Sequence, residues 1–109
     1  MIRARLSPRA ARDLKEICKR IAADNPDAAK EVRQTILNTA DFLASNPALG
    51  RRILRASPRH AAIRWFVVPK FRNYLIFYQP FKDTIAVLRI IHAAQDWTRF
   101  FPASRQKAG

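Results

Sequence analysis

The chain has 109 residues, of which 49% are hydrophobic, and 21 Lys and Arg against 8 Asp and Glu give a net charge of +13. This composition suffices for the core of one small domain and excludes a disordered segment, which would be poor in aromatic and β-branched residues. No apolar run approaches the roughly 20 residues of a membrane span, and the first residues lack the apolar stretch of a secretory signal. With a single cysteine, Cys18, no internal disulfide or thiolate cluster is possible. We therefore expect a cytoplasmic protein without a metal or cofactor.

The positive charge is concentrated in the second part of the chain. Residues 1–41 hold nine basic and six acidic side chains, a net charge of +3, whereas residues 42–109 hold twelve basic and two acidic ones, a net charge of +10. Fifteen of the basic residues are arginine, whose planar guanidinium suits bidentate contacts with phosphate or carboxylate. This excess predicts a polyanionic partner, either nucleic acid or an acidic protein.

The first part of the chain predicts a short strand and a helical hairpin. Apolar and basic residues alternate from Ile2 to Leu6, which is typical of a strand with one basic face. Ser7-Pro8 and Asn25-Pro26 each combine an N-cap residue with a proline at the first helical position, so a helix is expected after each. Asn46-Pro47 ends the second helix. Asp13 is expected to complement the dipole of the first helix. The apolar stripe expected on that helix comprises Ala11, Leu14, Ile17 or Cys18, then Ile21 and Ala22.

The second part of the chain predicts strands. Residues 62–68, 73–78 and 84–91 are rich in β-branched and aromatic side chains, and Gly50-Arg51-Arg52 predicts a turn. The last two strands are apolar on both faces, so we expect them at the centre of the sheet with the helices on one side. The sequence predicts one α+β domain over residues 1–102, in the order β-α-α-β-β-β, with a helical hairpin on a mainly antiparallel sheet. Residues 103–109 are expected to form a frayed tail.

Residues suited to catalysis are sparse. Cys18 lies among apolar helix positions and is interpreted as a core thiol. Cleavage of RNA would need a general base, a general acid and cations around the pentavalent phosphate. The candidates for those roles are Arg72, Arg89 and His92. For His92 the alternative is a histidine that ties the strand end through a hydrogen bond.

Arg89 is the most informative charged residue, because it interrupts an apolar run on a strand expected to be central. A charge there is costly unless it is paired or lines a groove. Two interpretations stay open: an internal ion pair, for which Asp96 is one candidate, and a groove cation that binds a partner's carboxylate. Arg64 poses the same question. Tyr74 and Tyr78 share one face of their strand and could stack on bases, relay protons or pack.

Five blocks of the chain form an ordered pattern. They are L-S-P-R-A-A-R-D-L at residues 6–14, D-N-P-D-A-A at 24–29, P-A-L-G-R at 47–51, N-Y-L-I-F-Y at 73–78 and V-L-R-I-I-H at 87–92. In this order and spacing they resemble the ParE/RelE superfamily of toxins, over about residues 2–96. The resemblance implies a small α+β toxin that is encoded with a cognate antitoxin, which wraps around it.

The superfamily has two functional branches, and the chain is more similar to one of them. RelE-like members cleave mRNA on the ribosome and carry a catalytic arginine just before an L-V-Y run. Here the equivalent run follows Tyr74, with Arg72 two residues before that tyrosine. The segment 92–96, H-A-A-Q-D, resembles the H-G-x-R-D ending of ParE-like members, which inhibit DNA gyrase. It departs from that pattern at Ala93 and Gln95.

The resemblance thus favours a non-catalytic gyrase inhibitor that is neutralised by an acidic, ParD-like antitoxin in a hetero-oligomer. The alternative is a ribosome-dependent mRNA endoribonuclease, and a plain nucleic-acid-binding domain ranks third. No membrane association is expected. The residues predicted to contact the antitoxin or the target are Arg51, Arg52, Arg64, Tyr74, Arg89 and His92.

Overall fold

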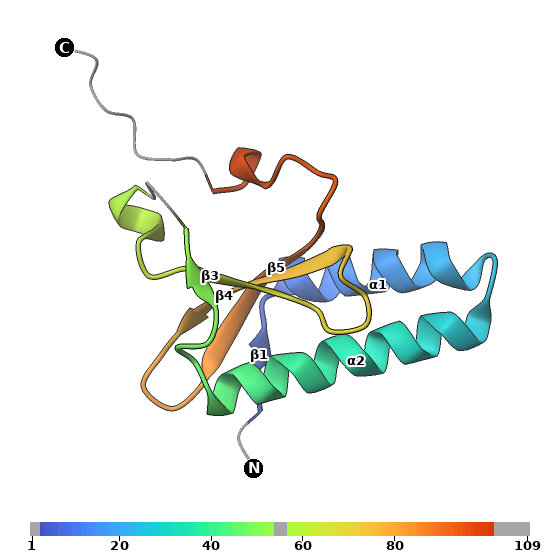
Figure 1. Cartoon of the computed structure of the whole chain (residues 1–109), viewed down its shortest axis with the longest axis horizontal. Coiled ribbons are helices and arrows are strands. Elements are labelled where there is room, and N and C mark those ends of the chain that lie inside the picture. The colour runs from blue at the N-terminus through green and yellow to red at the C-terminus, as the bar shows by residue number, and fades with distance from the viewer. Residues whose placement is uncertain (1–2, 54–56, 102–109) are drawn as a thin grey trace.

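The computed structural model describes residues 3–53 and 57–101. Two helices pack on one face of a five-stranded sheet whose strand order is β1-β5-β4-β3-β2 (Figure 1). The strands are β1 (Arg5–Leu6), β2 (Arg51–Arg52), β3 (Arg64–Val67), β4 (Tyr74–Pro80) and β5 (Ile85–His92). Strand β1 is parallel to β5, and the other neighbours are antiparallel. The predicted α+β class and the central position of the last two strands are confirmed. The predicted tail lies outside the described residues.

Both helices begin at the predicted capping residues. Helix α1 (Pro8–Ala22) starts after Ser7, whose hydroxyl accepts a hydrogen bond from the Ala10 N–H, and α2 (Pro26–Ser45) starts after Asn25, which caps in the same way. The predicted apolar stripe of α1 was wrong at one position. Ala10 is buried and Ala11 is exposed, because Ala10 leads into the i+4, i+7 row of Leu14 and Ile17 that faces the sheet. Among the described residues, neither helix is long and apolar enough to cross a membrane.

The outer strands differ from the prediction. Strand β1 covers only Arg5 and Leu6 of the predicted strand: Ile2 lies outside the described residues, and the Ala4 N–H donates to Asp41 Oδ1 on α2. The predicted turn at Gly50-Arg51-Arg52 instead contains an edge strand, β2, paired with the start of β3. Two exposed arginines give no apolar alternation, so the pairing with β3 had no signal in the sequence.

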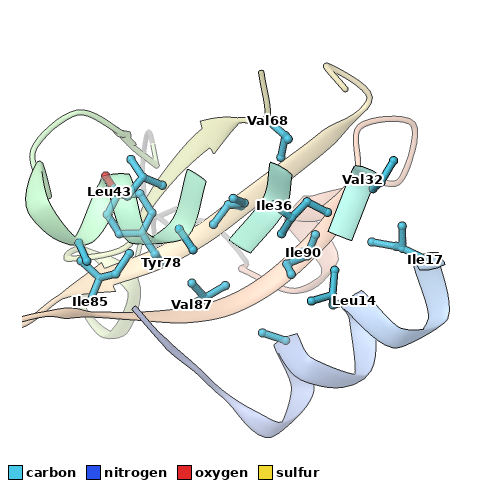
Figure 2. Close-up of a cluster of buried hydrophobic side chains, with 14 residues drawn as sticks. Leu14, Ile17, Val32, Ile36, Leu43, Val68, Tyr78, Ile85, Val87 and Ile90 are labelled. Carbon is cyan, nitrogen blue, oxygen red and sulfur yellow. The ribbon is translucent and has the colours of Figure 1, made fainter. Parts of the chain in front are cut away.

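The sheet separates two apolar clusters. On the helix side, Leu14, Ile36 and Leu43 pack against side chains of β4 and β5 such as Tyr78 and Ile90 (Figure 2). The opposite face is covered by the short 3-10 helix η2 (Trp97–Arg99) together with Phe100 and Phe101. There the Phe77 ring stacks on Phe101, with ring centroids 4.8 Å apart, and also contacts Trp97. Both faces of β4 and β5 are therefore buried, as their continuous apolar runs predicted.

Candidate functional site

A small polar cavity lies where β5 ends beside α1. Its volume is about 280 Å³, and three of the predicted site residues, Tyr74, Arg89 and His92, line it together with Gln95. Arg72 does not line this cavity; it is exposed in the turn between β3 and β4. The structure thus brings together three of the seven predicted residues and leaves the other four, Arg72 and the arginines at positions 51, 52 and 64, outside this cavity. Helix α1 supplies the remaining polar wall through Arg9, Asp13, Glu16 and Arg20.

Arg89 forms a buried ion pair with Asp13 on α1. Its Nε lies 2.7 Å from Asp13 Oδ2 and its Nη2 lies 3.1 Å from Oδ1, the bidentate geometry that arginine and carboxylate prefer. The Arg89 side chain is 14% exposed and that of Asp13 6%. The expectation that Asp13 serves the helix dipole was wrong, since the residue lies beyond the first turn and turns inward to the strand. The internal ion-pair interpretation of Arg89 therefore describes the structure.

A β-bulge places Arg89 for this contact. Phe77 pairs with Arg89 but the next residue, Tyr78, pairs with Val87, so Leu88 is an extra residue in β5. The bulge moves Ile90 onto the helix side, and its N–H donates to Asp13 Oδ2 over 3.0 Å. Asp13 thereby supplies the acceptor that a longer β1 would otherwise provide. The Arg89 guanidinium also lies 4.1 Å from the centre of the Phe100 ring, a cation–π contact.

His92 is engaged at the strand end. The ring nitrogen Nδ1 of His92 accepts a hydrogen bond from the Ala94 N–H at 3.0 Å. The backbone N–H of His92 donates to the Gln95 side-chain oxygen at 3.2 Å. The imidazole meets the Tyr74 ring edge to face, with centroids 5.2 Å apart. These contacts match the interpretation of His92 as a tie for the end of the strand. The ring still lines the cavity, and Nδ1 is the ring nitrogen that takes part in that tie.

Comparison with known proteins identifies the family. The family model described as the ParE toxin of the type II toxin–antitoxin system parDE matches residues 4–97, which include both α-helices and all five strands of the described sheet. The chain belongs to the ParE toxin family. It is also 37% identical over 95 residues to the "Putative toxin Y4kP" of Sinorhizobium fredii (strain NBRC 101917 / NGR234), an alignment that covers 87% of this chain and 92% of that protein.

A solved structure shares the fold of this ParE-family toxin. A chain of the chromosomal ParDE TA system from P. aeruginosa superposes with a TM-score of 0.66 at 21% sequence identity, covering 84% of this chain and 96% of that one. The resemblance expected from the five sequence blocks is confirmed by these comparisons. The chain is a ParE-type toxin of a type II toxin–antitoxin system.

The other predicted arginines lie at the opposite edge of the sheet. Arg64 donates from Nη1 to the carbonyl oxygens of Gly50, at 2.6 Å, and of Ala48, at 3.3 Å. Arg51 lies over the Trp65 ring, 6.0 Å from its centre, and Arg52 is exposed. Arg64 therefore organises the loop between α2 and β2, whereas the two edge arginines point their charge to the surface.

Sequence reasoning missed the role of Tyr78 in the ParE-family chain. The tyrosine is fully buried, and its hydroxyl accepts from the Gly50 N–H and donates to the Pro47 carbonyl, both over 2.8 Å. A side chain at Gly50 would collide with this ring, because an added Cβ would lie 2.4 Å from the Tyr78 hydroxyl. The only signal for this contact in the sequence was Gly50, which lies between α2 and β2. It is one of the two glycines of the chain, the other being Gly109.

Burial gives Tyr78 a measurable effect on stability at high pH. It raises the pKa of the phenol above the ordinary 10.0, although the Gly50 hydrogen bond and the charge of Arg64 act in the opposite direction. Above that ordinary value the unfolded chain releases the phenolic proton while the folded chain retains it, so stability falls as pH rises. We expect the free energy of unfolding to decrease more between about pH 9 and pH 11 in the wild type than in Tyr78→Phe. Urea denaturation across this range measures the difference, and parallel curves would contradict it.

Cys18 is half-buried in the groove between the helices. Burial raises the pKa of its thiol, and the nearby Arg33 charge opposes that shift only in part. A raised pKa disfavours the reactive thiolate. Cys18 packs against the helix-side core and its Sγ lies 3.8 Å from the Ala29 carbonyl, a geometry that suits the predicted packing role.

Proposed function

We propose that this ParE-family toxin inhibits DNA gyrase by binding it, without catalysing a reaction. The family match over residues 4–97 is the observation that carries the proposal. The cavity geometry supports it, because the groups suited to phosphate chemistry are engaged elsewhere: Arg89 is held by Asp13, and Nδ1 of His92 accepts from Ala94. Arg72, the third candidate for nuclease chemistry, lies outside the cavity.

The test is a gyrase supercoiling assay with the purified protein. We expect supercoiling of relaxed plasmid to fall as toxin is added, and Arg72→Ala to inhibit as strongly as the wild type. The matched assay maps mRNA ends in a translating extract, where we expect the message to stay intact. Unchanged supercoiling at excess toxin, together with cleaved message that depends on Arg72, would reverse the assignment in favour of the endoribonuclease alternative.

A groove between α1, α2 and β1 is the surface that best fits an antitoxin. Two adjoining cavities, of about 390 and 480 Å³, share Leu6, Arg33 and Leu37 and so form one continuous depression. The floor is apolar, with Leu14 and Cys18 beside the shared leucines, and Lys15, Arg33 and Arg3 make the rim mainly basic. The one acidic lining residue, Asp41, accepts a hydrogen bond from the Ala4 N–H. An amphipathic helix with an apolar face and acidic edges would bury its apolar face here and place its carboxylates on the rim.

We therefore propose that an acidic antitoxin occupies this helix groove in a cytoplasmic hetero-oligomer. Toxins of this class are encoded beside their antitoxins, so the probe is the product of the adjacent reading frame, co-expressed and purified. The net charge of +13 predicts fast, salt-sensitive association with it.

Reversing one rim charge should slow the formation of that complex. Arg33 is exposed on α2 and lines both parts of the groove. We expect Arg33→Glu to lower the association rate about tenfold at low salt, because electrostatic steering acts on the rate of encounter. Arg72→Glu, the same charge change in the β3–β4 turn, serves as the control. Surface plasmon resonance at two salt concentrations measures both association rates. Equal rates for the two variants would contradict the proposal that the antitoxin binds in this groove.

A further inference from the structure

Exposed apolar side chains gather at the C-terminal end of α2. Phe42 is 53% exposed and Leu49 48%, two of the three large hydrophobic residues that are exposed in the described part of the chain. A shallow cavity of about 320 Å³ is lined by residues 46–49. Asn46 connects it to the helix, because its side-chain amide donates to the Phe42 carbonyl. We call Phe42 and residues 46–49 the α2-end patch.

The α2-end patch is held rigidly from beneath. Tyr78 bonds both ends of its loop through its buried hydroxyl, and Arg64 donates to two further loop carbonyls. The Leu49 N–H donates to the Asn46 carbonyl over 3.1 Å. The exposed leucine is thus carried on a fixed backbone. A surface that is already ordered loses little conformational freedom when a partner binds, so its apolar contacts contribute more of their energy to affinity.

The charges around the α2-end patch define the chemistry of its occupant. No acidic residue occurs between Asp41 and Asp83, while the exposed Arg51 and Arg52 follow the patch after Gly50. A partner surface with an apolar pocket and flanking carboxylates would complement both features. A second copy of this chain would bring a net charge of +13 against another +13, and its own arginines against these two.

The α2-end patch and the helix groove lie toward different edges of the sheet. The loop of the patch is bonded to β3 and β4 and runs into the edge strand β2, whereas the groove includes β1 at the other edge (Figure 1). On α2 the groove reaches Asp41, next to Phe42, whereas the loop cavity is lined by residues 46–49, none of which lines the groove. A partner can therefore occupy the groove while Leu49 remains accessible to another.

We propose that the α2-end patch is the surface through which this toxin docks onto an acidic, apolar-lined site of its target, which is DNA gyrase if the proposed function holds. Leu49 enters the apolar pocket of the target, Phe42 packs at its margin, and Arg51 and Arg52 pair with the flanking carboxylates. The antitoxin binds in the groove, and its affinity does not depend on a contact with Leu49.

The experiment is a double dissociation between the patch and the groove. The patch variant is Leu49→Asp, which removes the apolar anchor at an exposed position, with Phe42→Ser as a second patch variant and Leu49→Met as the conservative control. The groove variant is Arg33→Glu. Each is measured for inhibition of gyrase supercoiling and for binding to the product of the adjacent reading frame. Circular dichroism and urea unfolding establish that each variant is folded.

We expect Leu49→Asp to raise the toxin concentration for half-inhibition by about tenfold or more, as for a buried apolar anchor, with antitoxin binding unchanged. Leu49→Met should inhibit like the wild type, and Arg33→Glu should bind the antitoxin about tenfold more slowly at low salt while it still inhibits gyrase. Full inhibition by a folded Leu49→Asp would overturn the docking proposal alone. Loss of antitoxin binding by Leu49→Asp would assign the patch to the antitoxin. A wild-type toxin that leaves supercoiling unchanged would refute the proposed function and this docking site together.

Discussion

Asp13→Ala should destabilise the protein by about 3–5 kcal/mol, the cost typical of removing one member of a buried ion pair. The substitution leaves the Arg89 guanidinium buried without its carboxylate and the Ile90 N–H without its acceptor. Breaking a buried pair costs more than the pair itself contributes, since the remaining charge is still removed from water. Urea denaturation followed by tryptophan fluorescence measures the change in the free energy of unfolding.

Glu16→Ala is the matched control for Asp13→Ala. Glu16 is an exposed carboxylate one turn further along α1, and its loss should change stability by no more than about 0.5 kcal/mol. The double variant Asp13→Ala with Arg89→Met should recover part of the loss, because the unpaired charge is then removed as well. If Asp13→Ala were as stable as Glu16→Ala, the carboxylate would not be the internal partner of Arg89.

Gly50→Ala should be the second most damaging substitution, with a cost of about 1–3 kcal/mol or more from overpacking. An added Cβ would lie 2.4 Å from the hydroxyl and 2.7 Å from Cε1 of Tyr78, a ring with no exposed surface and no space to retreat. Displacing that ring would also break the hydroxyl's bonds to Gly50 and Pro47. Thermal unfolding by calorimetry measures the loss.

Tyrosine-to-phenylalanine variants separate the hydrogen bonds from the steric effect. Tyr78→Phe keeps the ring and leaves the Gly50 N–H and Pro47 carbonyl without a partner, which should cost about 1–3 kcal/mol. Tyr74→Phe, a half-exposed tyrosine on the same face of β4, should change stability by less than about 0.5 kcal/mol. Equal losses for the two variants would show that the hydroxyl of Tyr78 contributes nothing specific.

Local chemistry made the helices and central strands predictable. Ser7 and Asn25 satisfy free N–H groups at the helix starts, and each is followed by a proline whose missing N–H costs nothing there. Strands β4 and β5 are apolar on both faces, which is possible only where each face is covered. These signals depend on neighbours in the sequence, so they can be interpreted without knowledge of the fold.

The contacts that define the site depend on residues far apart in the sequence. Asp13 and Arg89 are separated by 76 positions, and Gly50 and Tyr78 by 28. Periodicity located Arg89 on a central strand and so predicted that it needs a partner or a groove, but it offered no way to choose among the acidic residues. The bulge at Leu88, which sets the direction of Arg89, leaves no mark in a run of apolar residues.

The carboxylate of Asp13 has a further consequence for how this toxin behaves in solution. Strand β5 extends past the end of β1, so without α1 its last residues would present free backbone groups to any passing strand. The Asp13 carboxylate accepts a hydrogen bond from the Ile90 N–H, and α1, which carries Asp13, prevents another strand from pairing there. The chain is thereby protected from edge-to-edge pairing with a second copy of itself. Asp13→Ala should therefore also make the chain prone to aggregate during refolding.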